Sequence, residues 1–589
     1  MLPNASLFSH LKEAYKYAKE YFLNSEQRYK ASFMLVLAVI CVVGLVLATA
    51  GFSWWWVMFW AAFEAKSMLA LIASMKIFAG LAIAYLGLKS AFSFLVDSIK
   101  INWRQWLTEK LISEYLDGEN NYLELSRTSK ELNNPSQRIQ EDVDSFVKAT
   151  ISLSLNFIKS TLTQVTFIST LWVIGGPLAF TLFGANIIIP GYLVWVALAL
   201  AISATGIKNY IGKRLESLNN TEANAEADFR SELEQIPQNA ESIALERGET
   251  YFKNSLTHKF SVIFNNAYQK IIVRSSLAAF DGFYNQFSWI FPYLAAAPIY
   301  FGNAISLGQL MQIGFAFSEV NESFGWFMNS FEELSAYKTS IRRVVELREA
   351  IAKGNDDSSE KNIKIDCCSN QIIINNLQLN KPTGNNAISN PLNLTINENE
   401  KALIAGPSGL GKSTLLKAIA GTWKFGSGQI TVPKENTMYV PQSPTIPRNS
   451  SLKAILAYPK PIETYKDEEY REVMTKADLT THIDKLDENN DWGNVFSGGE
   501  KQRIAFARVF LANPEWVFLD ESTSALDTSR EEKLYKELPE SYVSISHSQT
   551  VQKHHPIWIN CQEENSLLSL AKVNAANDNH QPEAVLNCP

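Results

Sequence analysis

The stretch Gly406-Pro-Ser-Gly-Leu-Gly-Lys-Ser-Thr414 decides how the C-terminal part of this chain folds. It matches a pattern in which glycines let backbone N–H groups surround phosphate oxygens at the start of a helix. The preceding residues 402–405 are apolar and predict a buried strand, and residues 415–420 predict the following helix. We therefore expect the whole loop to bind the phosphates of a nucleotide: Gly406, Pro407, Ser408, Gly409, Leu410, Gly411, Lys412, Ser413 and Thr414.

Two polar side chains of this loop are expected to contact the phosphates and the metal ion. Lys412 is predicted to reach the β- and γ-phosphates, and the Ser413 hydroxyl is predicted to bind Mg²⁺. Further along, Trp516–Glu521 is an apolar run that ends in two acids. Asp520 is predicted to hold Mg²⁺, and Glu521 is predicted to polarise the attacking water. Beside a phosphate-binding loop, this pattern favours nucleotide hydrolysis over two solvated acids at the end of a strand.

Long uncharged runs mark the N-terminal part of the chain as a membrane domain. Residues 31–51 carry no charge, Lys159 and Lys208 bracket 48 uncharged residues, and Asp281 and Glu319 bracket another 37. One membrane-spanning helix needs about 20 apolar residues, so the two longer runs each predict a helical hairpin. A weaker span, about 68–96, contains two lysines that can extend toward the membrane surface. The total is an all-α transmembrane domain of six helices.

Charge between the spans predicts the orientation. Residues 97–148 carry seven Lys and Arg, residues 206–275 carry nine, and the connections near 176–188 and 300–308 carry none. Positive loops stay in the cytoplasm, so both termini are predicted to be cytoplasmic. The net charge of -7 shows no basic excess, which makes nucleic acid an unexpected partner.

The chain is therefore predicted to be a multidomain membrane protein with a second, α/β nucleotide-binding domain. The predicted divisions are a cytosolic segment 1–30, a transmembrane domain 31–345, a linker 346–362, the α/β domain 363–561 and a disordered tail 562–589.

The stretch Phe496-Ser-Gly-Gly-Glu500 resembles the Leu-Ser-Gly-Gly-Gln signature of the ABC ATPase family, with Phe and Glu as mild departures. The family's other motifs are matched in order by Gln442, Asp527 and the switch histidine His547. The resemblance implies that ATP and Mg²⁺ are bound, with Gln442 contacting the metal. It implies four catalytic residues: Glu521, His547, Gln442 and Lys412. An aromatic residue that stacks on adenine is not evident in residues 377–382, so the adenine contact is left unassigned.

In this family ATP lies between the phosphate-binding loop of one domain and the signature of another. This chain has one of each, so the resemblance implies a homodimer. The residues expected to contact ATP across the dimer are Ser497, Gly498, Gly499, Glu500 and Asp527.

The membrane half looks like the SbmA/BacA-type domain of bacterial peptide permeases and peroxisomal acyl-CoA transporters. The resemblance covers about residues 50–345 and rests on 103–108, 134–142, 226–230, 239–241 and 248–249, with Ser136 where relatives usually have Asp. It implies an exporter-like architecture that imports large polar cargo, such as cobalamin, peptides or bleomycin-like glycopeptides, across the bacterial inner membrane. The alternatives are export of peptides or drugs, acyl-CoA or lipid transport, and a membrane-tethered ATPase that transports nothing.

Three acidic residues are candidates for a transport cavity: Asp281, Glu319 and Glu322. If the sixth span begins near Leu307, Glu319 lies about 18 Å along it, near the middle of the membrane, and Glu322 shares its face. Carboxylates at that depth are costly and usually face a cavity or a partner. An acidic cavity for polar or cationic cargo and a helix–helix or dimer contact both remain open.

Overall fold

The computed structural model describes the chain except residues 1–6, 117–121, 124, 126–134, 183–184, 355–362, 368–369, 383–385, 434–435, 565–566 and 575–589. Residues 355–362 of the predicted linker and the last part of the predicted tail lie outside the described residues. The predicted linker boundary at residue 346 is wrong, because residues 346–354 continue the helix Leu307–Gly354. The chain separates into two compact units. The membrane unit comprises residues 1–115 and 132–349, and the ATPase unit comprises residues 116–131 and 350–589.

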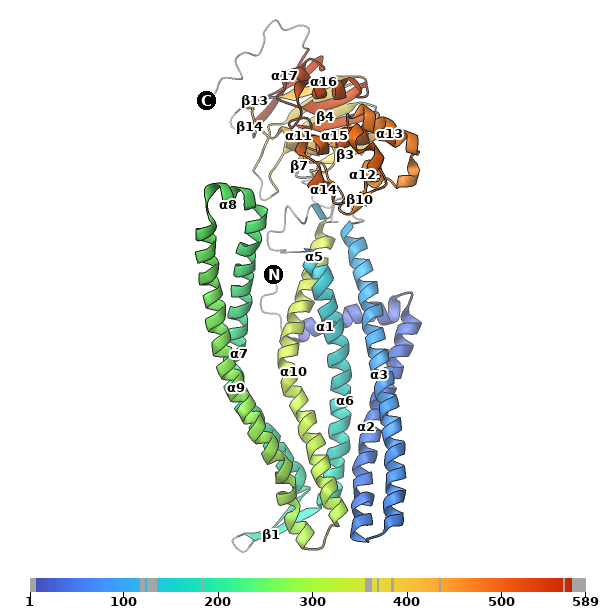
Figure 1. Cartoon of the computed structure of the whole chain (residues 1–589), viewed down its shortest axis with the longest axis vertical. Coiled ribbons are helices and arrows are strands. Elements are labelled where there is room, and N and C mark those ends of the chain that lie inside the picture. Colours follow the sequence, from blue (N-terminus) through green and yellow to red (C-terminus); the bar gives the residue numbers. More distant parts are fainter. Residues whose placement is uncertain are drawn as a thin grey trace. The chain divides into compact units, whose positions relative to one another are not determined.

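Six long helices build the membrane unit, as the sequence predicts (Figure 1). They are α2 (Arg28–Glu64), α3 (Met68–Leu116), α6 (Val143–Gly175), α7 (Tyr192–Gln238), α9 (Glu249–Phe301) and α10 (Leu307–Gly354). The sixth begins at Leu307, where it was expected. Shorter elements accompany them: α1 (Leu7–Lys19), a π-helical turn (Glu20–Asn24), α5 (Pro135–Gln137), a second π-helical turn (Arg138–Asp142) and α8 (Ala240–Glu246).

The apolar composition of these helices suits a lipid environment. Among the described residues, α2, α3, the helical run Pro135–Gly175 and α7 are long and apolar enough to cross a membrane. Large apolar side chains such as Leu69, Ile83 and Val173 are mostly exposed, which water would penalise and lipid would not. The turn between α6 and α7 is a β-hairpin of β1 (Pro177–Leu182) and β2 (Ala185–Pro190).

Aromatic packing joins the N-terminal helices to the C-terminal part of α3. Trp103 is fully buried and stacks on Tyr21 at 5.7 Å between ring centroids, while Phe146 meets its edge at 5.6 Å. Arg348 of α10 completes this contact with ion pairs to Glu20 and Glu114 at 3.0 Å each. Trp103 and Leu107 of the motif 103–108 therefore lie in a core where α1, α3, α6 and α10 meet.

The polar ends of α7 and α9, beyond their apolar spans, pair with each other over a long distance. Lys270 forms an ion pair with Glu222, Lys259 forms one with Glu232, and Asn266 donates to the backbone carbonyl of Leu218. Opposite charges on facing helices explain why these polar segments stay helical beyond the apolar spans.

A parallel sheet forms the centre of the ATPase unit. Its strand order is β14 (Leu567–Asn574), β13 (Ile557–Glu564), β6 (Lys401–Ala405), β12 (Ser541–Ile545), β11 (Trp516–Asp520) and β8 (Thr437–Val440). Only the β13–β14 pair is antiparallel within this sheet. The predicted strand before the phosphate loop and the apolar run before the paired acids are confirmed as strands β6 and β11, and a further strand, β12, precedes His547.

A second sheet and a helical layer complete the unit. The sheet has the order β3 (Lys364–Cys367), β7 (Gly426–Val432), β4 (Ile372–Leu379) and β5 (Leu392–Ile396). The helices are α11 (Lys412–Ile419), α12 (Leu452–Ala457), α13 (Asp467–Lys476), α14 (Trp492–Val495), α15 (Gly498–Ala512), α16 (Thr528–Lys536) and α17 (Gln549–Gln552). Short elements lie between them: 3₁₀ helices at Ile462–Thr464 and Thr480–Lys485, and the pair β9 (Ser450–Ser451) and β10 (Asn489–Asn490).

The prediction of a disordered tail from residue 562 is wrong for residues 562–564 and 567–574. They form the end of β13 and the whole of β14, which pair from Ile557–Asn574 to Glu564–Leu567. Leu568 is fully buried and Leu570 packs beside it in the same core, because alternate residues of a strand share a face. The domain boundary at residue 561 therefore falls inside a strand.

Candidate functional site

The phosphate-binding loop connects β6 to α11, and glycine is required at its first position. Gly406 has φ +146, and a Cβ there would lie 2.5 Å from the carbonyl oxygen of Cys561, which excludes any side chain. Gly411, at φ +94, caps the start of α11. The loop therefore has the conformation and the helix N-terminus that phosphate binding needs.

Lys412 folds back over this loop. Its Nζ donates to the carbonyl oxygens of Gly406 at 2.5 Å and Pro407 at 2.8 Å. Burial lowers the pKa of Lys412, while the nearby Cys561, Glu521 and Asp520 raise it in part. The cation is thus held at the loop beside the two acids of β11.

Of the three residues predicted to hold Mg²⁺, Ser413 and Asp520 are adjacent, whereas Gln442 hydrogen-bonds to Glu521. Ser413 Oγ donates to Asp520 Oδ1 at 2.7 Å, and the Tyr439 hydroxyl donates to Asp520 Oδ2 at 2.8 Å. Burial, together with the Asp520 charge, raises the pKa of Tyr439, which keeps the phenol protonated as a donor. A hydroxyl beside a carboxylate fits Mg²⁺, which prefers oxygen ligands and is usually held by one or two protein groups plus substrate phosphates. The described residues contain no cluster of three or more His, Cys, Asp or Glu for a metal.

Three of the predicted catalytic residues gather around one carboxylate. Glu521 accepts from Gln442 Nε2 at 2.9 Å, and His547 Nε2 lies 3.8 Å from its other oxygen. Glu521 has φ +45, and its N–H donates to the carbonyl oxygen of Ile545 at 3.0 Å. A left-handed backbone is costly for a residue other than glycine and is often found at functional sites. The arrangement fits a base that receives a proton from water, and the individual roles remain predictions.

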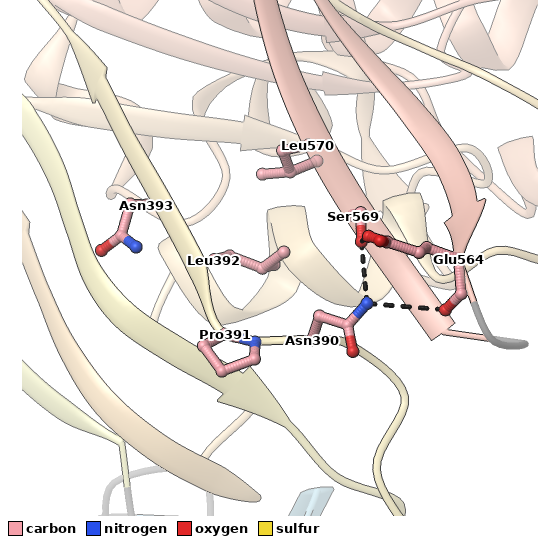
Figure 2. A pocket seen from close by; sticks show the side chains of 7 residues that line it. All are labelled: Asn390, Pro391, Leu392, Asn393, Glu564, Ser569 and Leu570. Carbon is pink, nitrogen blue, oxygen red and sulfur yellow. Dashed lines mark hydrogen bonds between the residues drawn. The ribbon is translucent and has the colours of Figure 1, made fainter.

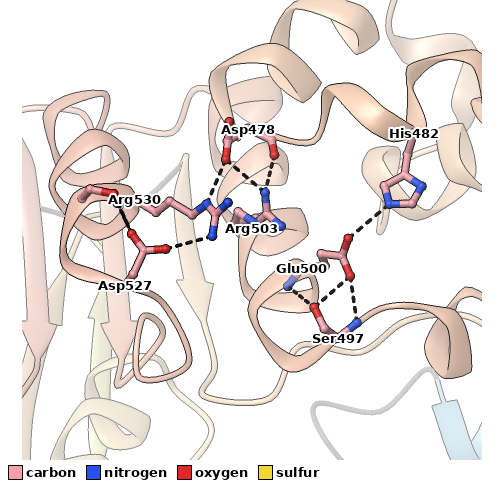
Figure 3. Close-up of polar contacts among 8 residues, drawn as sticks. Asp478, His482, Ser497, Glu500, Arg503, Asp527 and Arg530 are labelled. Atoms are coloured by element: carbon pink, nitrogen blue, oxygen red, sulfur yellow. Dashed lines mark hydrogen bonds and ion pairs between the residues drawn. The ribbon is translucent and has the colours of Figure 1, made fainter.

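The signature forms the N-terminus of α15. Ser497 caps the helix, with its hydroxyl accepting from the Glu500 N–H, while Glu500 Oε2 accepts from the Ser497 N–H at 3.0 Å. A Cβ at Gly499 would lie 3.0 Å from the carbonyl oxygen of Ala525, so the signature packs tightly on the segment before Asp527. Asp527 caps α16 and pairs with Arg530 at 2.8 Å (Figure 3). Contact of these residues with ATP on a second chain remains a prediction.

Two neighbours of the site were missed by the sequence analysis. Tyr439 orients Asp520, and its only signal was its place three residues before Gln442. Ile388 lies next to the phosphate loop, since its Cγ2 would be 2.9 Å from a Cβ at Gly411. Its only signal in the sequence was its apolar side chain in the mostly polar stretch 380–390.

The three acidic candidates in the membrane unit have different surroundings in the structure. Asp281 of α9 forms an ion pair with Lys208 of α7 at 2.6 Å, which agrees with the helix–helix alternative for this residue. Glu319 and Glu322 both lie on α10, with Glu319 half-buried and Glu322 exposed.

A hollow of about 330 Å³ between α2, α9 and α10 is lined by uncharged residues instead. Its lining is Trp56, Asn285, Ser288, Trp289, Tyr293, Met311, Gly314, Phe315, Ser318 and Asn321. Asn321 is fixed there by the Tyr284 hydroxyl, which donates to its Oδ1 at 2.5 Å, and by Ser288, which accepts from its Nδ2 at 3.3 Å. None of the three acidic candidates lines this hollow.

Another hollow, of about 400 Å³, lies in the ATPase unit near the start of β5 and the β13–β14 hairpin (Figure 2). Its polar groups bond to one another: Asn390 donates to Ser569 Oγ at 2.8 Å, and Ser569 donates to Glu564 Oε2 at 2.9 Å. None of the predicted site residues lines it.

Comparisons with known proteins cover both units. The family described as ABC transporter transmembrane region 2 matches residues 18–301, and the family described as ABC transporter matches residues 389–524. The chain is 32% identical over 438 residues to the inner membrane ABC transporter ATP-binding protein YddA of Escherichia coli K12, covering 74% of this chain and 76% of YddA. It is 26% identical over 518 residues to the human lysosomal cobalamin transporter ABCD4, covering 80% of this chain and 81% of that protein.

A solved structure of a bacterial Atm1-family ABC exporter with ATP bound matches with a TM-score of 0.68. The match covers 93% of this chain and 96% of the exporter chain at 16% identity, so it shows a shared fold.

Proposed function

The chain belongs to the ABC transporter family, and on that premise we propose that two copies form a transporter that uses ATP to take up large polar cargo across a bacterial inner membrane. The ATPase unit is an ATP hydrolase coupled to transport. Dimerisation, the direction of transport and the class of cargo are the proposed parts.

The observation that carries the proposal is the cluster around Glu521. A carboxylate held between Gln442 and His547, beside the Asp520–Ser413 pair, is an arrangement for hydrolysis of a bound nucleotide. A complete cluster argues for an ATP-driven transporter over a permease with an inactive ATPase.

Each residue has a proposed task. Lys412 leaves the carbonyls of its own loop and neutralises the β- and γ-phosphates. Glu521 accepts the proton of the attacking water, and Gln442 and His547 hold its carboxylate in place. Mg²⁺, held by Ser413 and Asp520, supplies charge neutralisation at the phosphates when it is bound.

A dimer is proposed because one chain has one phosphate loop and one signature. Ser497 caps only the Glu500 N–H, so other N–H groups at the start of α15 are free. Their partial positive charge suits the γ-phosphate of a nucleotide on the other copy. ATP binding then closes the dimer, because ATP binds better to the state in which both surfaces contact it.

The cargo class rests on two observations. A relative that matches over most of both chains is named as a cobalamin transporter. In addition, the hollow between α2, α9 and α10 offers amide and hydroxyl groups beside aromatic faces, without a charge. Such a lining suits neutral amides and hydroxyls on a large ligand. We therefore assign one cargo contact to this hollow and no longer assign a cargo contact to Asp281.

A transport experiment tests the proposal. The wild type and Glu521→Gln are expressed in a bacterium that lacks its own cobalamin and peptide uptake, and entry of labelled cobalamin and sensitivity to bleomycin are measured. ATP-driven import predicts uptake or sensitisation with the wild type alone. Protection by the wild type alone would establish export, and an equal response with both variants would contradict ATP-driven transport.

A further inference from the structure

A turn at the end of α13 contacts both segments that a second copy's nucleotide would meet. This 478–482 turn contains Asp478 and the first residues of the 3₁₀ helix, ending at His482. Figure 3 shows that His482 points toward the signature, while Asp478 points toward two arginines. The proposed dimer gives these contacts their importance, so the inference rests on that proposal.

His482 supports Ser497 through one intermediate residue. His482 Nε2 lies 3.2 Å from Glu500 Oε1, and Glu500 Oε2 accepts from both the N–H and the hydroxyl of Ser497, at 3.0 and 2.8 Å. The side chains of His482 and Glu500 are 16% and 24% exposed, so water competes weakly for these bonds. Burial raises the pKa of Glu500, but bonds from Ser497 and His482 lower it overall, so the carboxylate is charged near neutral pH.

The surroundings of His482 determine which nitrogen carries its proton. The ring meets the edges of Phe496 and Trp492 at centroid distances of 5.2 and 5.9 Å. Its Nδ1 is buried and has no hydrogen-bond partner among the described residues. A proton on Nδ1 would therefore be left unpaired, which favours a proton on Nε2, from which His482 donates to Glu500.

Asp478 supports Asp527 in the same way. Arg530 donates from Nε to Asp478 at 2.9 Å and from Nη1 to Asp527 at 2.8 Å, so one guanidinium bridges the two carboxylates. Arg503 of the signature helix donates to the backbone carbonyl of Asp478 and also lies 3.3 Å from its carboxylate.

The two supported segments are also joined directly. Gln502 donates to Ser524 Oγ at 3.1 Å and accepts from the Ala525 N–H at 2.9 Å. A displacement of the 478–482 turn would therefore move Ser497 and the segment before Asp527 together.

We propose that His482 and Asp478 are positioning residues for ATP hydrolysis, which hold Ser497 and Asp527 of one copy at the face that meets the nucleotide of the other copy. Neither residue touches ATP. They set the orientation of groups that do.

His482→Phe and His482→Gln separate positioning from packing. Phe keeps the ring contacts and removes the donor, whereas Gln keeps a donor. In the full-length protein in lipid nanodiscs, we expect His482→Phe to lower kcat for ATP about fivefold, the effect of one lost hydrogen bond, with KM unchanged. His482→Gln restores most of kcat. Equal kcat for His482→Phe and the wild type would overturn the proposal, as would a Gln variant as slow as the Phe variant.

A second measurement keeps the inference independent of turnover and transport. In a Glu521→Gln background, the ATP that stays bound through rapid gel filtration reports the closed dimer. We expect His482→Phe to shorten the half-life of this ATP about fivefold. If Glu521→Gln retains ATP longer than the double variant with His482→Phe, but the wild type moves no cargo, import is contradicted and the positioning role stands. Equal half-lives would overturn the positioning role and leave import intact.

Asp478→Asn has a matched control just beyond the 478–482 turn. Asp484 is exposed on the 3₁₀ helix Thr480–Lys485 and forms no ion pair among those described. Asp478→Asn is expected to lower kcat about threefold because a charge-assisted bond becomes neutral. Asp484→Asn is expected to leave kcat unchanged. Equal effects of the two substitutions would mean that only the charge of the turn matters, which would overturn the role of Asp478.

Discussion

Gln442, Glu521 and His547 come from the ends of three strands of one sheet, and each lies within a few residues of a recognisable sequence motif. The hollow in the membrane unit is built differently, from Trp56 on α2, Asn285 on α9 and Ser318 on α10. No short stretch of sequence contains the lining residues of more than one of these helices. The difference teaches that phosphate chemistry is specified locally, because every nucleotide has the same phosphates, whereas a cargo site depends on how long helices are placed beside one another.

The largest expected effect tests the local side of this comparison. Glu521→Gln is expected to lower ATP hydrolysis about 10³-fold, because the amide does not accept the proton of water. ATP binding is expected to persist, since Lys412 and the loop are unchanged. Phosphate release and nucleotide binding by the purified protein measure the two effects. Glu515→Gln, at an exposed position just before β11, is the control and should hydrolyse ATP normally.

The second prediction tests the packing of helices that are distant in the sequence. Trp103→Ala is expected to destabilise the membrane unit by about 3–5 kcal/mol, because a fully buried ring is removed from a packed core. Thermal unfolding in detergent measures the change. Trp54→Ala, at a ring that is 57% exposed, should have little effect. Equal destabilisation by both variants would contradict the central role of the Trp103 core.

The third prediction concerns the cargo contact. Asn285→Leu is expected to reduce cargo uptake about fivefold, because a polar group is lost from the lining and the ligand is left with an unpaired amide or hydroxyl. Basal ATP hydrolysis should be unchanged. Asn265→Leu, at an exposed position on the same helix, is the control. Normal uptake by Asn285→Leu would remove this hollow from the transport path.

The smallest expected effect is a pH dependence of the contact between the N-terminal segment and α10. Burial raises the pKa of Glu20, but hydrogen bonds from Lys110 and Arg348 lower it overall. A group whose folded pKa is lowered stabilises the protein above its unfolded pKa of about 4.3, and this stabilisation is lost as the pH falls through the folded pKa. Glu20→Gln should therefore lower the unfolding temperature at pH 7, by an amount corresponding to about 1 kcal/mol or less, and by less still at pH 4. The same difference at both pH values would contradict this contribution.

The sequence was sufficient for the six long helices and for the strands that carry the ATP-site motifs. Uncharged runs and the spacing of the motifs contain that information. It was insufficient for β14, because Leu567–Asn574 was read as part of a polar tail although alternate leucines pack into the core. Strand pairing depends on a partner, here β13, and a short alternating run does not reveal that partner.

The candidate site shows the same division. Ser413, Asp520, Gln442, Glu521 and His547 were named from motifs, and the structure brings them together. Tyr439, Ile388 and His482 were not, because the residues beside them, Asp520, Gly411 and Glu500, are distant in the sequence. For Asp281 the sequence left both a cavity and a helix–helix contact open, and its partner Lys208 on another helix became visible only in three dimensions.

The β13–β14 hairpin has a practical consequence for anyone who shortens this chain. β14 covers the outer edge of β13 from Ile557 to Glu564, so a chain cut after Cys561 would leave a truncated, apolar strand with unpaired backbone groups. Exposed edges of this kind recruit other strands, and such a fragment is expected to aggregate during expression. A soluble ATPase fragment should therefore extend at least to Asn574.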